Sequence, residues 1–192
     1  MSISRLPPLT VRQLGASALI VSPESVVKEL VDNSLDAEAT CVEVHVSPNT
    51  VDKILVRDNG HGISPSDFGS LGRRSHTSKL RNFDELSFKG GKTLGFRGDA
   101  LASASEMSRV TITTRTAKDA VATVLSLQPG QNSGGIVGQK PVSSPVGTTV
   151  EVADLHSMLP VRRKEYVKKA QKTLSNIKSL LQTYAMARPE IR

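Results

Sequence analysis

A helix followed directly by two short strands constrains the fold of this chain more than any other feature. Ser22 and Pro23 form a typical helix start, with serine as the N-cap and proline at the first helical position. Apolar residues then recur at helical spacing as far as Leu35. Residues 42–46 alternate like a strand, and residues 53–57 predict a second strand after a turn. This region therefore predicts a helix followed by a β-hairpin.

The later elements do not follow the regular strand–helix–strand order of a parallel sheet. Ser64-Pro65-Ser66-Asp67 resembles a capping box that opens a short helix. The pattern then predicts a helix over residues 98–107, strands over residues 109–115, 121–127 and 148–152, a glycine-rich turn over residues 130–138 and a long basic helix over residues 166–187. This order predicts an α+β fold, a two-layer sandwich of helices on a mixed, mainly antiparallel sheet.

The composition fits one soluble globular domain over residues 1–192. The chain is 38% hydrophobic and long enough for a sizeable core. It has no run of 18 apolar residues and no secretory signal, so we expect no membrane association. The single cysteine, Cys41, is predicted to be a core residue in a reducing compartment. The four histidines lack metal-ligand spacing, so we expect them to be structural or exposed.

Positive charge is concentrated at the C-terminal end. Residues 160–192 contain 9 basic and 2 acidic residues, which account for the whole net charge of +7. Such an asymmetry favours a polyanionic partner, DNA above all, although a solvated helix face explains it equally well. The candidate DNA-binding residues are Arg162, Arg163, Lys164, Lys168, Lys169 and Lys172.

The first helix carries a polar stripe of Glu29, Asn33 and Asp36, spaced i, i+4 and i+7. A carboxylate beside an amide oxygen suits hydrolysis of a phosphate ester. Glu29 could deprotonate water, and Asn33 could hold Mg²⁺ through its carbonyl oxygen. The alternative is an ordinary solvated polar face.

Asp58 follows the second strand and is followed by Gly60 and Gly62. A carboxylate at a strand end can accept a hydrogen bond from an adenine amino group, and glycines let backbone approach the base. The alternative is an ordinary aspartate-rich turn.

Three further segments could hold phosphate. Residues 95–98 precede a helix and contain two glycines, an arrangement that lets backbone N–H groups bind phosphate. Thr77, Ser78 and Lys79 lie in an irregular segment of about residues 74–94, whose length is typical of a functional loop such as a lid. Residues 147–149 give the weakest signal, since they could simply begin a strand.

Taken in order, these motifs resemble those of the ATPases shared by DNA gyrase B, the heat-shock chaperone of that fold, sensor histidine kinases and MutL, which have a Bergerat-type ATP-binding fold. The finer resemblance is to MutL, the mismatch-repair ATPase, and it covers nearly the whole chain. It rests on residues 26–37, 56–63, 77–79, 94–103 and 159–164. Residues 10–14 and 112–116 are similar to the eukaryotic postmeiotic-segregation type.

The resemblance implies a role for each matched residue. Glu29 would activate water, Asn33 would bind Mg²⁺ and Asp58 would contact adenine. The other nucleotide-binding residues implied are Asp36, Gly60, Gly62, Thr77, Ser78, Lys79, Gly95, Phe96, Arg97, Gly98 and Thr148. The implied cofactors are ATP and Mg²⁺.

The resemblance also implies partners and a cellular role. The protein would act in DNA mismatch repair in the nucleus, with a MutL-type partner subunit, DNA and a MutS-type mismatch recognition protein. ATP would order the lid near residues 74–94 and drive closure around DNA. Residues 17–22 replace a Gly-Glu-Val segment that contributes to the dimer in many MutL proteins, and Asp99 replaces a glutamate. The basic helix at residues 160–192 would lead to a second domain that supplies a lysine to the γ-phosphate.

Three hypotheses follow from these patterns. The first is an ATPase domain that hydrolyses ATP to ADP and phosphate. The second is a nucleotide-gated DNA-binding module with little or no intrinsic ATPase activity. The third is a histidine-kinase ATP domain, which would need an acceptor histidine on a separate helical domain.

Overall fold

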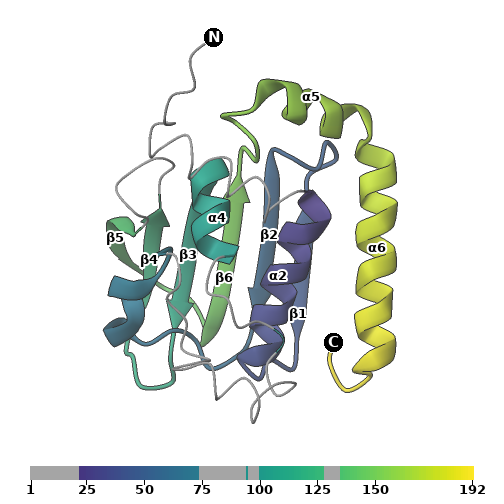
Figure 1. The fold of residues 1–192 in the computed structure, drawn as a ribbon. Helices are drawn as coiled ribbons and strands as arrows, with labels where there is room; N and C mark the ends of the chain where they lie inside the picture. The colour runs from purple at the N-terminus through teal and green to yellow at the C-terminus, as the bar shows by residue number, and fades with distance from the viewer. Residues whose placement is uncertain (1–21, 74–93, 95–99, 128–134) are drawn as a thin grey trace, which may run out of the picture.

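A six-stranded sheet forms the centre of the computed structural model, which describes residues 22–73, 94, 100–127 and 135–192 (Figure 1). The strands lie in the order β1-β2-β6-β3-β4-β5, and each described pairing is antiparallel. Their bounds are β1 Val42–Val46, β2 Lys53–Asp58, β3 Arg109–Arg115, β4 Ala122–Leu127, β5 Ile136–Val142 and β6 Gly147–Ala153.

Helices α2 (Pro23–Asp36) and α4 (Ala100–Met107) lie over the same face of this sheet (Figure 1). Helix α6 (Ala170–Ala187) runs beside α2 on the side away from α4, and α5 (Pro160–Lys168) crosses one end of the sheet. The 3₁₀ helix η1 (Pro65–Ser70) follows β2. Helices packed on a mainly antiparallel sheet are what the sequence predicts, and the α+β sandwich is confirmed. No described helix is long and apolar enough to cross a membrane.

The start of α2 is capped as the sequence predicts. Ser22 Oγ accepts a hydrogen bond from Ser25 N at 3.2 Å, and Ser25 Oγ accepts from Ser22 N at 3.1 Å. Reciprocal bonds of this kind satisfy donors that a helix N-terminus leaves free. Behind this cap, Val27 and Leu30 are buried against the sheet.

The core of the sheet consists of two parallel rows of apolar side chains. The antiparallel registers align Val44, Val56, Val150, Ile112 and Leu125 in one row and Val46, Ile54, Val152, Val110 and Leu127 in the next. Side chains two residues apart on a strand share a face, so both rows lie on the same side, beneath α2 and α4.

A third row lies on the same face, and there the side chains become polar. It aligns Val42, Asp58, Thr148 and Thr114 across β1, β2, β6 and β3. Asp58 therefore lies one step beyond the apolar core, beneath the C-terminal half of α2, rather than on the solvent face of the sheet.

Two predicted elements are wrong. The predicted turn over residues 130–138 instead includes the start of β5, an edge strand that contains Gly138 and Pro141. Both residue types disfavour strands, but an edge strand tolerates them. The single helix predicted over residues 166–187 is two helices that meet at Lys169, because α5 crosses the sheet end while Ile177 anchors α6 in the core.

Two local predictions also need correction. Ser64 makes no side-chain cap for η1, and its hydroxyl instead contacts Ser66 Oγ at 2.8 Å. Cys41 is half-buried rather than a full core residue. The turn between β1 and β2 is confirmed, and Asn49 Oδ1 stabilises it by accepting bonds from Val51 N and Asp52 N at 3.2 and 3.1 Å.

Candidate functional site

Asp58 is the centre of the polar row, at the end of β2. Its Oδ1 accepts hydrogen bonds from Gly60 N at 2.9 Å and Thr148 N at 3.1 Å. Its Oδ2 accepts from Ser34 Oγ on α2 at 3.0 Å. The carboxylate is thus fixed by donors from its own turn, from β6 and from α2.

The environment of Asp58 has two opposing effects on its charge. Burial raises the pKa of the carboxyl group, while the bonds from Gly60, Ser34 and Thr148 and the nearby His61 lower it. A carboxylate has about four acceptor positions. The described residues fill three of them, which leaves Oδ2 able to accept one more hydrogen bond.

Thr148 and Thr114 extend the site across the sheet. Their hydroxyl groups lie 3.2 Å apart, and Thr114 Oγ1 also accepts from Ile63 N at 2.8 Å. Ile63 follows Gly62, so this bond fastens the loop after Asp58 to β3. The loop and two strand ends are therefore held as one unit.

The glycines of this loop are required by neighbouring protein backbone. A Cβ on Gly60 would lie 2.5 Å from Ala37 O, and one on Gly62, whose φ is +74°, would lie 2.2 Å from Arg115 O. Gly60 thus lets the loop approach the end of α2, and Gly62 lets it approach β3. That these glycines also let backbone approach a ligand stays a prediction.

Helix α2 presents three different faces. Residues are about 100° apart around a helix, so Leu30 and Ser34 face the sheet, while Asp32 faces α6. The half-buried stripe that includes Glu29 and Asn33 occupies the flank between these two faces. Glu29 lies close enough to α6 for its charge to contribute to the raised pKa of Tyr184, while Asn33 directly precedes Ser34, which bonds to Asp58.

Asp36, at the end of the stripe, connects α2 to Leu94. Its Oδ1 accepts a hydrogen bond from Leu94 N at 2.8 Å. Leu94 directly precedes residues 95–98, the predicted phosphate-binding segment, in the sequence. Seven predicted site residues lie outside the described part of the chain: Thr77, Ser78, Lys79, Gly95, Phe96, Arg97 and Gly98.

The predicted Mg²⁺ site fits the residues of α2 in chemistry. Mg²⁺ prefers oxygen ligands, and it is usually held by one or two protein side chains together with phosphate oxygens and water. Asn33 supplies such an oxygen, and Glu29 and Asp36 add negative charge on the same flank. A site of this kind needs the nucleotide to be complete.

The predicted DNA-binding residues are separated by the structure into two groups. Lys164, Lys168, Lys169 and Lys172 are exposed, whereas Arg162 and Arg163 are half-buried. Lys169 also pairs with Glu165 at 2.5 Å. The exposed lysines on α5 and α6 therefore carry the prediction of a polyanion partner.

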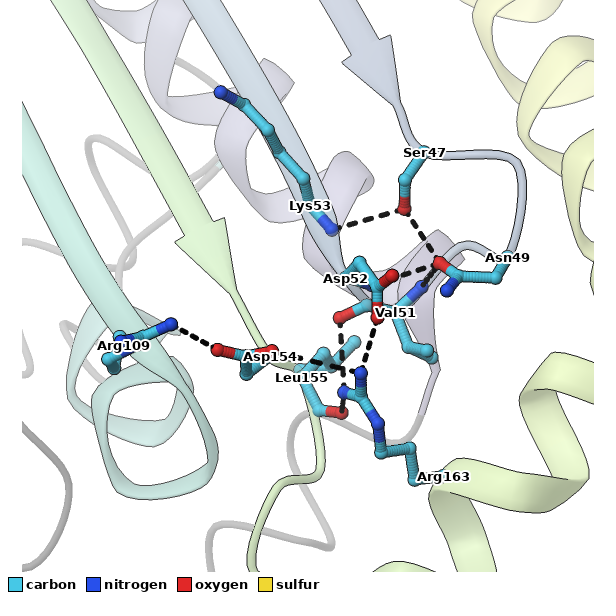
Figure 2. A network of polar contacts seen from close by, with 9 residues as sticks. All are labelled: Ser47, Asn49, Val51, Asp52, Lys53, Arg109, Asp154, Leu155 and Arg163. Atoms are coloured by element: carbon cyan, nitrogen blue, oxygen red, sulfur yellow. Dashed lines mark hydrogen bonds and ion pairs between the residues drawn. The ribbon is translucent and has the colours of Figure 1, made fainter.

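Arg163 is already engaged within the domain, as Figure 2 shows. Its guanidinium group pairs with Asp52 and, at 3.7 Å, with Asp154, which also pairs with Arg109. It further donates to Leu155 O at 3.1 Å. These contacts fasten α5 to the loops at the sheet end, and a DNA contact by Arg163 stays a prediction.

Three residues of the site are not among the predicted ones. Ser34 and Thr114 support Asp58 and the loop, and Asn59 fastens the loop to the segment after α2 by accepting from Thr40 N and Cys41 N at 2.9 Å each. Ser34 is in the same motif as Asn33, which is a usable signal. Thr114 gives no local signal, because its partner Ile63 is 51 residues away.

The comparisons with known proteins identify the class to which this site belongs. The model of histidine kinase-, DNA gyrase B-, and HSP90-like ATPases matches residues 21–157. The chain belongs to this ATPase family.

Within the family, the similar relatives are mismatch repair proteins. PMS1 protein homolog 1 of Homo sapiens is 42% identical over 192 residues, covering 99% of this chain and 20% of the human protein. The DNA mismatch repair protein MutL of Aeromonas hydrophila is 40% identical over 191 residues, covering 100% of this chain and 30% of that protein. The predicted resemblance to MutL is confirmed, and the chain spans less than a third of the length of these relatives.

A solved structure agrees with this assignment. The Aquifex aeolicus MutL ATPase domain complexed with ADP has a TM-score of 0.64 and 35% identity, covering 88% of this chain and 57% of that chain. The N-terminal domain of a DNA repair protein has a TM-score of 0.78 and 32% identity, covering 94% of this chain and 51% of that chain. The fold is that of MutL-type ATPase domains.

Proposed function

We propose that this chain is the ATPase domain of a MutL-type mismatch repair subunit, and that it binds ATP with Mg²⁺ and hydrolyses it to ADP and phosphate. The observation that carries the proposal is the acceptor position on Asp58 Oδ2 that the described residues leave unfilled, beneath α2 and beside its polar stripe. The family supports nucleotide binding, and the ADP complex of a similar MutL domain supports the same chemistry here.

Asp58 would recognise the adenine ring. The exocyclic amino group of adenine is a donor, and Oδ2 of Asp58 is an acceptor whose direction is fixed by Ser34. Because Oδ1 accepts hydrogen bonds from Gly60 N and Thr148 N, the carboxylate cannot rotate without losing those bonds. A fixed acceptor favours adenine over bases that present an oxygen at this position.

Glu29 would act as the general base for hydrolysis. Water would attack the γ-phosphorus while the bond from that phosphorus to the β,γ-bridging oxygen breaks, and the proton from water would pass to the Glu29 carboxylate. Bound Mg²⁺, held through the carbonyl oxygen of Asn33, supplies positive charge that offsets the charge of the phosphates. Residues 77–79 and 95–98 are proposed to hold the phosphates.

The replacement Asp58→Asn tests the adenine assignment with little disturbance of the fold. Asparagine keeps an oxygen for Gly60 N and Thr148 N, but replaces the acceptor Oδ2 with an NH₂ donor. We expect ADP affinity, measured by calorimetry, to fall by more than about 10-fold. The control is Asp67→Asn, on the exposed surface of η1. Equal ADP affinity in both variants would remove Asp58 as the adenine contact.

The roles of the whole protein are part of this proposal. Its relatives are mismatch repair proteins of human, plant and bacterial origin, which supports a MutL-type partner subunit, DNA and a MutS-type protein as partners. Nucleotide-driven closure, dimerisation and, for a eukaryotic source, nuclear location belong to the same proposal.

DNA binding is the second candidate function, because α5 and α6 present exposed lysines. In this case the domain would be a nucleotide-gated DNA-binding module with little turnover. Each phosphate contact contributes a slope of about −0.9 to the dependence of log affinity on log salt concentration. Replacing Lys164 and Lys168 with alanine is expected to reduce the slope by about 1 to 2. An unchanged slope would exclude phosphate contacts at these two lysines.

A further inference from the structure

Helices α2 and α6 are joined by two hydrogen bonds at matching positions. Asn176 Nδ2 donates to Glu24 Oε1 at 3.1 Å, and the Tyr184 hydroxyl donates to Asp32 Oδ1. The partners are 152 residues apart in both pairs, so the two helices run in the same direction and in register. Ile177 is buried between the two bonded positions on α6. The two helices therefore lie side by side and are bonded at two levels (Figure 1).

Asp32 is the most constrained polar group at this contact. Its side chain is only 3% exposed, and its Oδ2 accepts from Lys28 Nζ at 2.6 Å while Oδ1 accepts from Tyr184. The bond to Asp32 raises the pKa of Lys28, and burial together with Asp32 raises the pKa of Tyr184. A buried carboxylate is costly unless it is paired, so this geometry strongly resists rearrangement.

We propose that Tyr184 and Asp32 form a positioning pair that fixes the rotation of α2 about its axis and so places Glu29 and Asn33 for catalysis. The inference rests on the ATP hydrolysis proposed above. It assigns to α6 a task in the reaction, which it performs through Asp32, the residue next to Asn33.

The mechanism follows from helix geometry. Asp32 directly precedes Asn33 and is three residues after Glu29, so the three residues span about one turn of α2. A rotation of about 15° would move a side-chain tip about 5 Å from the helix axis by about 1.3 Å. A misplacement of about 1 Å can cost about 100-fold in rate. The Tyr184 bond acts on the rotation directly, because it joins the helices at this turn.

The test compares Tyr184→Phe with Asn176→Ala in the 192-residue chain. Each variant removes one of the two α2–α6 hydrogen bonds, but only Tyr184 bonds at the turn of Glu29 and Asn33. For Tyr184→Phe we expect ADP affinity without Mg²⁺ to be unchanged, since Asp58 is not disturbed. We expect the Mg²⁺ concentration for half-maximal nucleotide-dependent turnover to rise about 5- to 10-fold. Asn176→Ala should leave the Mg²⁺ requirement unchanged.

A second measurement needs no nucleotide. Amide hydrogen exchange, followed by mass spectrometry, should become faster in the second half of α2 in Tyr184→Phe and remain unchanged in β3 and β4. Adding Asp32→Ala to Tyr184→Phe should have no further effect on the Mg²⁺ requirement if the two side chains act as a unit.

The outcomes separate this inference from the proposed function. If the wild type binds and hydrolyses ATP while Tyr184→Phe has a normal Mg²⁺ requirement, the positioning role is overturned and the proposed function stands. If both variants raise the Mg²⁺ requirement equally, α6 only stabilises the domain, and the inference is overturned. A wild-type chain that binds no nucleotide would overturn the proposed function and the positioning role together.

Discussion

The buried His156 should make the domain unstable at mildly acidic pH. Its side chain is 0% exposed, its ring stacks on Tyr166 with centroids 5.4 Å apart, and neither ring nitrogen has a hydrogen-bond partner among the residues that the structure describes. Burial, together with the charges of Arg162 and Arg163, lowers the pKa of His156 from 6.5 to about 4. The folded domain therefore holds this histidine in its neutral form.

The size and sign of the effect follow from the two pKa values. Above pH 6.5 the histidine is neutral in both the folded and the unfolded chain, so it adds no pH dependence. As the pH falls from 6.5 towards 4, the unfolded chain takes up a proton that the folded chain excludes. The loss in the free energy of unfolding is about 2–3 kcal/mol at pH 4.5 and about 3 kcal/mol at pH 4 and below.

The assay compares urea unfolding of the wild type and His156→Phe at pH 7.5 and 4.5. Phenylalanine keeps the ring against Tyr166 and removes the titrating nitrogens. His156 has a φ of +61°, where phenylalanine is strained, but that cost does not depend on pH. We expect the wild type to lose about 2–3 kcal/mol more than the variant between the two pH values. Equal losses would refute the reasoning, because carboxylates that titrate in this range are common to both proteins.

Three further predictions concern the site and its supports. Gly62→Ala should lower the free energy of unfolding by at least about 2 kcal/mol, because a Cβ there would overlap Arg115 O. A Cβ on Gly69 would meet nothing within 4 Å, so Gly69→Ala should change this free energy by less than about 1 kcal/mol. Chemical denaturation measures both. Ser34→Ala removes one donor to Asp58 and should weaken ADP binding about 5-fold by calorimetry, and an unchanged affinity would show that Ser34 does not orient the carboxylate. Arg163→Ala should lower the free energy of unfolding by about 1–2 kcal/mol, and the exposed Lys164→Ala by less than about 0.5 kcal/mol; equal effects would contradict the structural role of Arg163.

Short-range patterns were sufficient to predict much of the fold. The serine–proline start of α2 and the residue patterns of β1, β2 and β3 depend on residues close in sequence, and all four elements form where predicted. Edge strand β5 could not be predicted in this way, because Gly138 and Pro141 hide a strand that forms through pairing with β4. The division between α5 and α6 likewise depends on packing against α2.

The candidate site shows the same division between local and distant information. The motif order predicted Asp58, and the resemblance to MutL gave its role. Its hydrogen-bond partners Ser34 and Thr148 are 24 and 90 residues away, so their contact with Asp58 depends on the fold, although Ser34 lies in the same motif as Asn33 and Thr148 is in a predicted segment. The charge count could not separate Arg163 from the exposed lysines, because its ion pair with Asp52 spans 111 residues.

A single-turnover experiment tests the central claim most directly. Protein in excess is mixed with labelled ATP and Mg²⁺, and both the retained nucleotide and the ADP formed are measured for the wild type and Glu29→Ala. The account predicts that both proteins retain nucleotide and that only the wild type forms ADP. ATP retained intact by both would contradict hydrolysis and favour the nucleotide-gated module, and equal ADP formation by both would remove Glu29 as the base.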